Sequence, residues 1–466
     1  MVKYVIIIFI TLQLVQPFYA YRYKLHKPPK RYPIPQDADD PLILTPFLEQ
    51  NQILEAQQAA VVNYAGFKNI TSYSGFFTVD KRFNSNHFFW FFPSENDYKN
   101  DPVVLWLQGG PGASSLFALF NENGPFIIGE DLNVTIRDVY WSQSHSVLYI
   151  DNPVGTGFSF NDEGGYAQNE TKVGSDLYSS VTQFFTLFPE LQANEFYISG
   201  ESYAGKYVPA LAYTIHKNNP TADLKINLNG LLIGNGWTDP YNQLDYGEFL
   251  YQVGLYDESQ KEVLDGYKVL AQKYIDEGDY LRATNYTDFA ILGDIATVTG
   301  IPNVYNFADV DSAPLDGPYE EFVQTVARSS IHVGDIGFGD DEVYDNLEAD
   351  SSQNVAPWLA ELLSYYRVLI FVGQLDTVCP YPGVVNYLKQ LNFSAAAEYK
   401  SASREVWFVD NDVAGYYKRA GNLTELLVRS AGHMVPTDQP EWAFNFLYRF
   451  TRGLSLNDDS KPVKVL

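Results

Sequence analysis

Short, strongly apolar runs recur along the chain and constrain its fold more than any other feature. Several end at a glycine-bearing turn, after which a helix-compatible segment begins. A strand buried on both faces reads as a continuous apolar run, and parallel strands need such crossover connections. The sequence therefore predicts an α/β fold with a mostly parallel central sheet and helices on both faces. The runs are Val103 to Leu107, Val147 to Ile150, Phe196 to Ile198, Leu231 to Ile233, Val368 to Val372 and Leu426 to Val428.

Two further strand patterns precede these runs. Phe76 to Val79 and His87 to Phe92 are separated by a polar stretch, which indicates a hairpin. We expect the sheet to belong to a core built from residues 61–240 and 356–455, with residues 456–466 as a C-terminal tail.

Residues 241–355 have a different pattern of apolar residues, with helical spacing in place of short apolar runs. Val263, Tyr267, Leu270 and Tyr274 step by helical spacing and predict one face of an amphipathic helix. We interpret this region as a largely helical insertion that caps the active edge of the sheet. A separate domain is the alternative.

The N-terminus has the character of a secretory leader. In residues 1–20, Lys3 precedes an apolar run, and Ala20 is a small residue at a plausible cleavage point. We therefore expect a signal peptide. The alternative is a membrane anchor, but a spanning helix needs ~20 apolar residues and this run is shorter. No later stretch is long and apolar enough to span a bilayer. Residues 21–60 are expected to be a lead-in or a short propeptide.

Glycosylation signals agree with secretion, which predicts a secreted or lysosomal protein. Six Asn-X-Ser/Thr sequons occur, at Asn69, Asn133, Asn169, Asn285, Asn392 and Asn422. The chain has one cysteine, Cys379, so it can form no internal disulfide and depends on its core for stability. The formal net charge of −26 repels phosphate backbones, which argues against nucleic acid as a partner.

A nucleophile elbow is predicted around Ser202. Ser199-Gly200-Glu201-Ser202-Tyr203-Ala204-Gly205 follows a predicted strand, and a helical pattern continues from Lys206 to His216. Small residues at 200 and 204 let the chain turn sharply and expose the hydroxyl of Ser202. Ala204 stands where the usual motif has glycine, and the motif alone is weak evidence.

Two more predicted strands end next to groups that complete a catalytic triad. A serine hydroxyl needs a base, and the base needs an acid that fixes its tautomer. Among the six histidines, His433 follows the strand pattern that ends at Val428, and Asp376 follows the one that ends at Val372. Taken alone, each is more often structural. Their chain order after Ser202 is that of the α/β-hydrolase fold, so we predict these three residues as the triad.

Glycines after another strand suit an oxyanion hole. The segment Leu107-Gln108-Gly109-Gly110-Pro111-Gly112 allows close approach of a backbone N–H. We assign the Gly110 and Tyr203 N–H groups as the two donors, with a structural turn as the alternative reading for the other glycines.

Together these motifs resemble the serine carboxypeptidase family, and most closely its vitellogenic carboxypeptidase-like branch. The resemblance spans roughly residues 60–455. The motifs are Trp106 to Ser115, Glu122-Asn123-Gly124-Pro125, Asn152 to Ser159, Gly200 to Gly205 and Gly432-His433-Met434-Val435-Pro436.

The resemblance implies a serine-type carboxypeptidase that hydrolyses the C-terminal bond of peptides and proteins through an acyl-enzyme, without cofactor or metal. It also implies that Gln108, Gly109, Glu122 and Glu201 receive the terminal carboxylate of the substrate. Gln108 stands where asparagine is more usual. If the two glutamates approach each other, repulsion and burial raise a carboxyl pKa, which favours acidic pH.

Other functions fit parts of the same pattern. An acyltransferase would use the same triad, with an alcohol intercepting the acyl-enzyme. A catalytically silent stabilising homologue is the non-enzyme alternative, which an intact triad argues against. An endopeptidase or lipase fits the triad but not the carboxylate site that the resemblance implies.

Overall fold

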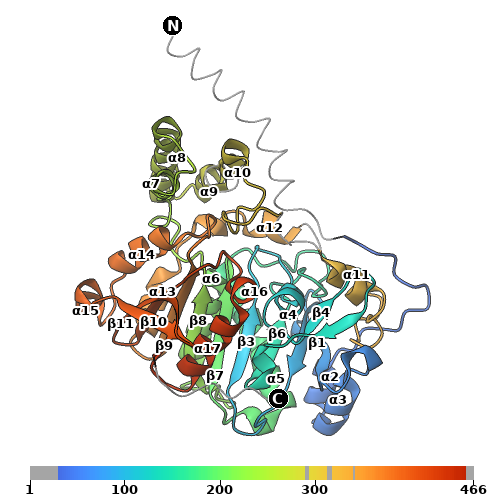
Figure 1. The fold of residues 1–466 in the computed structure, drawn as a ribbon. Helices are drawn as coiled ribbons and strands as arrows, with labels where there is room; N and C mark the ends of the chain where they lie inside the picture. Colours follow the sequence, from blue (N-terminus) through green and yellow to red (C-terminus); the bar gives the residue numbers. More distant parts are fainter. Residues whose placement is uncertain (1–29, 289–292, 312–316, 340–341, 458–466) are drawn as a thin grey trace.

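A twisted ten-stranded sheet runs through the computed structural model, which describes residues 30–288, 293–311, 317–339 and 342–457 (Figure 1). The strand order is β1-β2-β6-β3-β7-β8-β9-β12-β11-β10, and β4 and β5 form a separate hairpin. The strands are β1 Tyr73–Asp80, β2 Ser85–Phe92, β3 Val103–Leu107, β4 Phe126–Ile128, β5 Val134–Ile136, β6 Ser146–Ile150, β7 Phe196–Glu201, β8 Leu228–Gly234, β9 Arg367–Gly373, β10 Glu405–Val409, β11 Asp412–Ala420 and β12 Leu423–Val428.

The centre of the sheet is parallel and its two margins are antiparallel. Strands β6, β3, β7, β8, β9 and β12 pair in parallel, so their carboxyl ends share one edge of the sheet. The β1–β2 hairpin pairs antiparallel with β6, and β11 and β10 continue antiparallel from β12. Every run predicted as a strand lies in this sheet, so the α/β prediction is confirmed. Strands β10 and β11 were not predicted.

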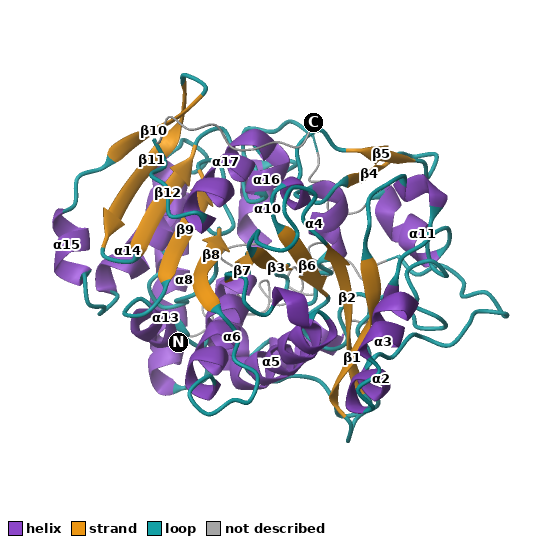
Figure 2. Cartoon of the chain, turned by 90° about the horizontal axis from the view of Figure 1, so that it is seen from below, coloured by secondary structure: helices purple, strands orange, loops and turns teal. Residues whose placement is uncertain are grey.

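Helices cover both faces of the sheet (Figure 2). One core cluster joins the sheet to α3, α5, α6, α13, α14 and α15, and a second joins its other face to α4, α16 and α17. The bounds are α2 Thr45–Glu49, α3 Ile53–Ala60, α4 Leu116–Asn121, α5 Glu170–Leu187, α6 Ala204–Asn218, α13 Ala356–Leu362, α14 Tyr381–Gln390, α15 Ala396–Ser401, α16 Val435–Asp438 and α17 Pro440–Thr451.

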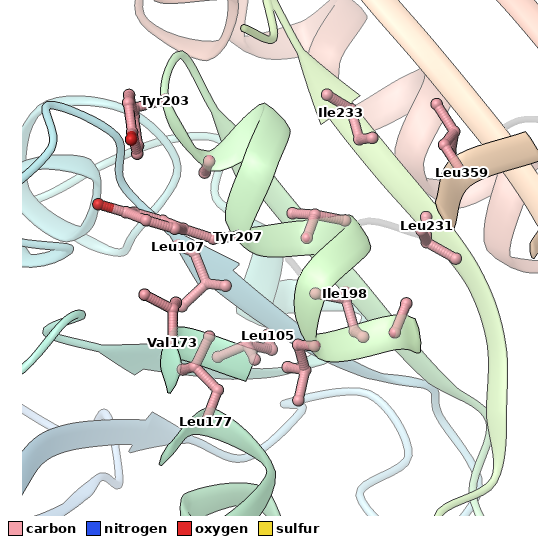
Figure 3. Packing of buried hydrophobic residues seen from close by; sticks show 14 of the residues in the cluster. Leu105, Leu107, Val173, Leu177, Ile198, Tyr203, Tyr207, Leu231, Ile233 and Leu359 are labelled. Carbon is pink, nitrogen blue, oxygen red and sulfur yellow. The ribbon is translucent and has the colours of Figure 1, made fainter. Parts of the chain in front are cut away.

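Strand β3 shows how the sequence divides between the two cores. Val103, Leu105 and Leu107 belong to the first cluster, whereas Val104 and Trp106 belong to the second. Successive side chains of a strand point to opposite faces, so a continuous apolar run is required where both faces are covered. Figure 3 shows the first cluster, where side chains from β3, β7 and β8 pack with those of α5 and α6.

The segment between β8 and α13 supplies most of the remaining helices. In Figure 1, α7 to α10 stand beyond the edge of the sheet, and α12 lies between them and the strands. The bounds are α7 Tyr246–Gln252, α8 Glu258–Glu277, α9 Tyr280–Asp288, α10 Asp294–Thr299, α11 Pro318–Gln324 and α12 Glu342–Leu347.

The predicted helix in this region is α8, and the predicted face is partly the one in contact, because Tyr267, Leu270 and Tyr274 are half-buried. Val263 is 48% exposed, whereas Leu264 and Ala271 are buried. The helix packs mainly against α7 and α9, and the rings of Tyr267 and Tyr274 lie against that of Tyr286 in α9.

The N-terminal segment joins the edge of the sheet from residue 42 onward. Leu44 is buried, its N–H donates to Phe76 O at 2.9 Å, and the N–H of Phe76 donates to Leu42 O at 2.9 Å. The expected signal peptide, residues 1–20, lies outside the described residues, as does most of the expected tail. None of the helices described has the length and apolar character needed to cross a membrane.

Candidate active site

Ser202 lies at a sharp turn between β7 and α6. Its φ is 63°, in the left-handed region that costs a non-glycine residue free energy. Three backbone hydrogen bonds hold this conformation. The N–H of Ser202 donates to Gly234 O at 3.0 Å, and its carbonyl accepts from the N–H of Gly205 and of Trp237, both at 2.9 Å.

The turn also needs the small residues that the sequence places there. A side-chain carbon at Gly200 would stand 2.7 Å from Cβ of Ala204, and one at Gly205 would stand 2.6 Å from the N atom of Trp237. Ser202 is partly exposed, while Glu201 and Tyr203 on either side are buried. The chain therefore presents the serine hydroxyl at the carboxyl edge of the sheet.

The structure brings Asp376 and His433 into direct contact. Nδ1 of His433 and Oδ2 of Asp376 are 2.8 Å apart, and both side chains are buried. An Nδ1–H that donates to the carboxylate leaves the other ring nitrogen as the proton acceptor. Nε2 of His433 is buried and has no hydrogen-bond partner within the described ranges. With the proton on Nδ1, the imidazole has the tautomer that a general base requires.

The loops that carry these two residues are held together by residues 303–307, a strap from the segment between β8 and α13. Val304 O accepts from the N–H of Thr377 at 3.3 Å, and Tyr305 O accepts from the N–H of His433 at 2.7 Å. The N–H of Phe307 donates to Leu375 O at 3.0 Å. The ring of Tyr305 also packs on the imidazole, with centroids 5.3 Å apart. The strap therefore fixes the acid and the base relative to each other.

The glycine-rich loop after β3 lies against the Ser202 turn. A side-chain carbon at Gly109 would stand 2.5 Å from the N atom of Tyr203 and 2.7 Å from Cβ of Ser202. Only glycine allows this approach. Gly110 is exposed and has a φ of +108°. The two N–H groups predicted as oxyanion donors thus belong to two backbone segments in contact beside the serine.

Beside this loop, Gln108 links to a pair of buried carboxyl groups. Its Oε1 accepts from Nε1 of Trp106 at 2.8 Å, and its Nε2 donates to Oε1 of Glu201 at 3.0 Å. The carboxyl of Glu122 faces that of Glu201, and both residues are fully buried. The structure therefore gathers the residues that the resemblance assigned to the substrate carboxylate.

Burial changes the acidity of the pair. It raises the pKa of Glu122 to about 8, against the partly opposing charge of Arg137. Burial, followed by the charge of Glu122, raises the pKa of Glu201 well above its ordinary range. Within the described residues, no donor satisfies either oxygen of Glu122 or Oε2 of Glu201. A proton bound between the two carboxyl groups would satisfy one oxygen of each.

The other described histidines lie in structural hydrogen bonds. His87 pairs with Ser180, His145 with Ser144 and Thr451, His216 with Tyr366, and His332 with Ser74. His26 lies outside the described residues. Over the ranges that the structure describes, no group of three or more His, Cys, Asp or Glu side chains could hold a metal ion.

Some residues of the site were missed by sequence reasoning. Asn235 donates to Asp376, Tyr305 contacts His433, and Arg137 lies near Glu122. Asn235 carried a signal, because it is a polar residue between two glycines directly after a predicted strand. Cys379 is buried beside Asp376, and burial raises the pKa of its thiol well above the ordinary range.

Comparisons with known proteins agree on one family. The family model for serine carboxypeptidases matches residues 64–453. The chain is 48% identical to venom serine carboxypeptidase of Apis mellifera, over 90% of this chain and 92% of that protein. It is 46% identical to vitellogenic carboxypeptidase of Aedes aegypti, over 90% and 91% of the two chains.

A solved structure supports the same conclusion. Kex1Δp of Saccharomyces cerevisiae, described as a prohormone-processing carboxypeptidase, superposes with a TM-score of 0.75 at 25% identity, over 85% of this chain and 96% of that one. The α/β-hydrolase fold and the resemblance to the vitellogenic carboxypeptidase-like branch are therefore confirmed. The chain belongs to the serine carboxypeptidase family and is a serine-type carboxypeptidase.

Proposed function

We propose that Ser202, His433 and Asp376 are the catalytic triad with which this carboxypeptidase removes single residues from peptide C-termini. The observation that carries the proposal is the 2.8 Å contact between Nδ1 of His433 and Oδ2 of Asp376, which leaves Nε2 without a partner among the described residues and able to act as the base. The strained, partly exposed turn at Ser202 supports it.

The reaction proceeds in two halves. Ser202 Oγ attacks the carbonyl carbon of the last peptide bond while Nε2 of His433 takes the hydroxyl proton. The N–H groups of Gly110 and Tyr203 stabilise the oxyanion. The intermediate collapses with cleavage of the C–N bond, and His433 protonates the departing amine, which leaves as the C-terminal amino acid. Water, activated by the same imidazole, then hydrolyses the acyl-enzyme.

Exopeptidase specificity comes from the carboxylate site. Gln108, Gly109, Glu122 and Glu201 receive the terminal carboxylate of the substrate. A protonated carboxyl of the glutamate pair donates a hydrogen bond to that carboxylate, whereas an ionised pair repels it. The raised pKa values of both groups keep the donor present at mildly acidic pH. Activity on free-acid peptides is therefore greatest at acidic pH.

The enzyme enters the secretory pathway and acts outside the cell or in the lysosome. All six sequon asparagines, at positions 69, 133, 169, 285, 392 and 422, are exposed, as an attached glycan requires. The Apis mellifera relative is named as a venom protein, and venom is secreted.

Peptide digestion combined with active-site labelling tests the proposal. Time-resolved mass spectrometry of a mixed peptide library should show stepwise C-terminal ladders, and a fluorophosphonate should label Ser202. We expect Ser202→Ala to lower kcat by roughly 10⁴-fold or more. Ser199→Ala is the matched control, because Ser199 lies buried in the same strand and away from the turn. Internal cleavage, or full activity in Ser202→Ala, would refute the proposal.

A further inference from the structure

Asn235 occupies a buried position directly after β8. Its side chain is fully buried and its φ is 41°, a left-handed conformation that asparagine tolerates better than most residues. Its N–H donates to Phe371 O at 2.9 Å, which ties this turn to the neighbouring strand β9. Asn235 thus lies at the carboxyl edge of the sheet, between the strand that leads to Ser202 and the strand that leads to Asp376.

Both ends of the Asn235 amide are engaged. Nδ2 donates to Oδ2 of Asp376 at 2.7 Å, and Oδ1 accepts from the N–H of Gly373 at 3.1 Å. The second bond fixes the orientation of the amide. A flipped amide would set an oxygen against the Asp376 carboxylate and an N–H against the N–H of Gly373. The donor is therefore held toward Asp376.

Asp376 receives hydrogen bonds on both carboxylate oxygens. Oδ1 accepts from the N–H of Val378 at 2.7 Å, and Oδ2 accepts from the N–H of Cys379 at 3.0 Å. Oδ2 is also the oxygen that contacts Nδ1 of His433 at 2.8 Å. Asn235 and His433 are the two side chains that share this oxygen in the described part of the chain. The amide of Asn235 and the imidazole of His433 therefore bind the same carboxylate oxygen.

We propose that Asn235 is a positioning residue of the triad, which holds the Asp376 carboxylate in the plane that meets His433 and limits the negative charge that Oδ2 offers to the imidazole. The proposal rests on the assignment of Asp376 and His433 as acid and base. Two consequences follow. Without the amide, the carboxylate is free to rotate away from Nδ1. Without the amide, the carboxylate also offers more negative charge to the imidazole and stabilises its charged form more strongly.

Other titratable groups face this pair and must be the same in all variants compared. Glu201 and Cys379 interact electrostatically with Asp376, as do Tyr246 and Tyr305, whose ring also packs on the imidazole. None of them is altered by substitution of Asn235, so a change of pH profile reports on the amide.

Two variants separate the positioning role from a merely structural one. Asn235→Gly removes the amide and tolerates the left-handed φ. Asn235→Asp keeps the size of the side chain but replaces the donor with an acceptor. Asn229→Ala is the matched control, because Asn229 lies on the same strand at its opposite end. Fluorophosphonate titration gives the concentration of folded sites, and kcat and KM per site are then measured against pH.

We expect kcat per titrated site to fall roughly 10- to 100-fold in Asn235→Gly, with KM nearly unchanged, by analogy with outer partners that orient a catalytic group. The acidic limb of its kcat profile should move to higher pH. Asn235→Asp should lose more, and Asn229→Ala should match wild type. Wild-type kcat and acidic limb per site in either Asn235 variant would overturn the proposal. Asp376→Asn tests the triad separately, because retained activity there would refute the triad itself.

Discussion

The carboxyl groups of Glu122 and Glu201 face each other in a site closed to solvent. Glu122 follows α4 and Glu201 ends β7, so the contact joins the end of a helix to the end of a strand. Burial raises the pKa of both groups, that of Glu122 to about 8. The pair therefore holds a proton at pH values well above those at which an ordinary carboxyl group ionises.

Substrate binding should report this change. For a peptide with a free C-terminal carboxylate, we expect KM to rise as the pH increases toward 8, because the ionised pair loses its donor and repels the substrate. A matched C-terminal carboxamide should show a flatter KM profile. Steady-state kinetics on both peptides, in wild type and Glu201→Gln, measure the effect. Identical profiles for the two substrates would rule out recognition by a carboxylic acid.

The same pair should make stability depend on pH. In the folded protein Glu122 has a pKa of about 8, raised from about 4.5, so the folded state holds its proton more tightly than the unfolded state. This contribution to stability is present in full below pH 4.5 and is lost as the pH rises through 8. We expect Glu122→Gln to gain stability relative to wild type over that window, by on the order of a few kcal/mol.

Urea unfolding at several pH values measures this difference. Asp151 is also buried, with a pKa raised to about 6 by burial, so only the difference between variant and wild type isolates Glu122. An equal pH dependence in both proteins would contradict the prediction.

Lys206 and Asp350 form a buried ion pair, with Nζ and Oδ2 2.5 Å apart. The hydroxyl of Tyr203 also donates to Asp350, at 3.0 Å. Removal of Asp350 takes away the carboxylate in contact with Lys206 and leaves the more weakly acidic Glu170 as its charged neighbour, so Asp350→Asn should destabilise the protein by about 3 kcal/mol. The double variant Lys206→Met with Asp350→Asn should lose less. Thermal and urea unfolding measure the stability of both variants. A double variant no more stable than the single one would argue against a buried charge as the cause.

Gly109 should tolerate no side chain. A methyl group there would stand 2.5 Å from the N atom of Tyr203, so it must displace the turn that carries Ser202. We expect Gly109→Ala to lower kcat on the order of 10²-fold, because the displaced turn takes the N–H of Tyr203 away from the oxyanion. Gly266→Ala is the control, since a methyl group there meets nothing within 4 Å. Similar kcat values in the two variants would contradict this role of the glycine loop.

Expression in a secretory host tests the proposed route. We expect a secreted chain that begins near Tyr21, with a heterogeneous mass that falls on glycosidase treatment. Intact-mass measurement and N-terminal sequencing provide the readout. A secreted product that retains residues 1–20 would show that the leader is not cleaved.

The central strands could be predicted because burial on both faces leaves a continuous apolar run, as in β3 and β9. Strands β10 and β11 were not predicted, because each exposes part of its length to solvent. In β11, polar residues such as Lys418 and Arg419 interrupt the apolar pattern. The contact face of α8 was predicted only in part, because Val263 is exposed whereas Tyr267, Leu270 and Tyr274 are half-buried.

The positions of the proposed triad could be predicted because each of its residues follows a strand. Ser202, Asp376 and His433 each occupy a loop at the same sheet edge, and the sequence marks those loops. The contact between Glu122 and Glu201 is different, because it depends on how α4 packs beside β7, and no local pattern encodes that distance. Only the resemblance to a family suggested it. The sequence marks Asn235 as a polar residue directly after a predicted strand. Its hydrogen bond to Asp376, however, depends on the register of β8 and β9.

The strap at residues 303–307 has a consequence for building chimaeras from this family. Its carbonyls hold the loops of Thr377 and His433, so the region between β8 and α13 is not a cassette that can be exchanged as one piece. Transplanting a relative's helices into this chain requires the junctions to fall on either side of the strap. A graft that replaces the strap as well must bring a backbone of the same shape, or the acid and the base lose their common support.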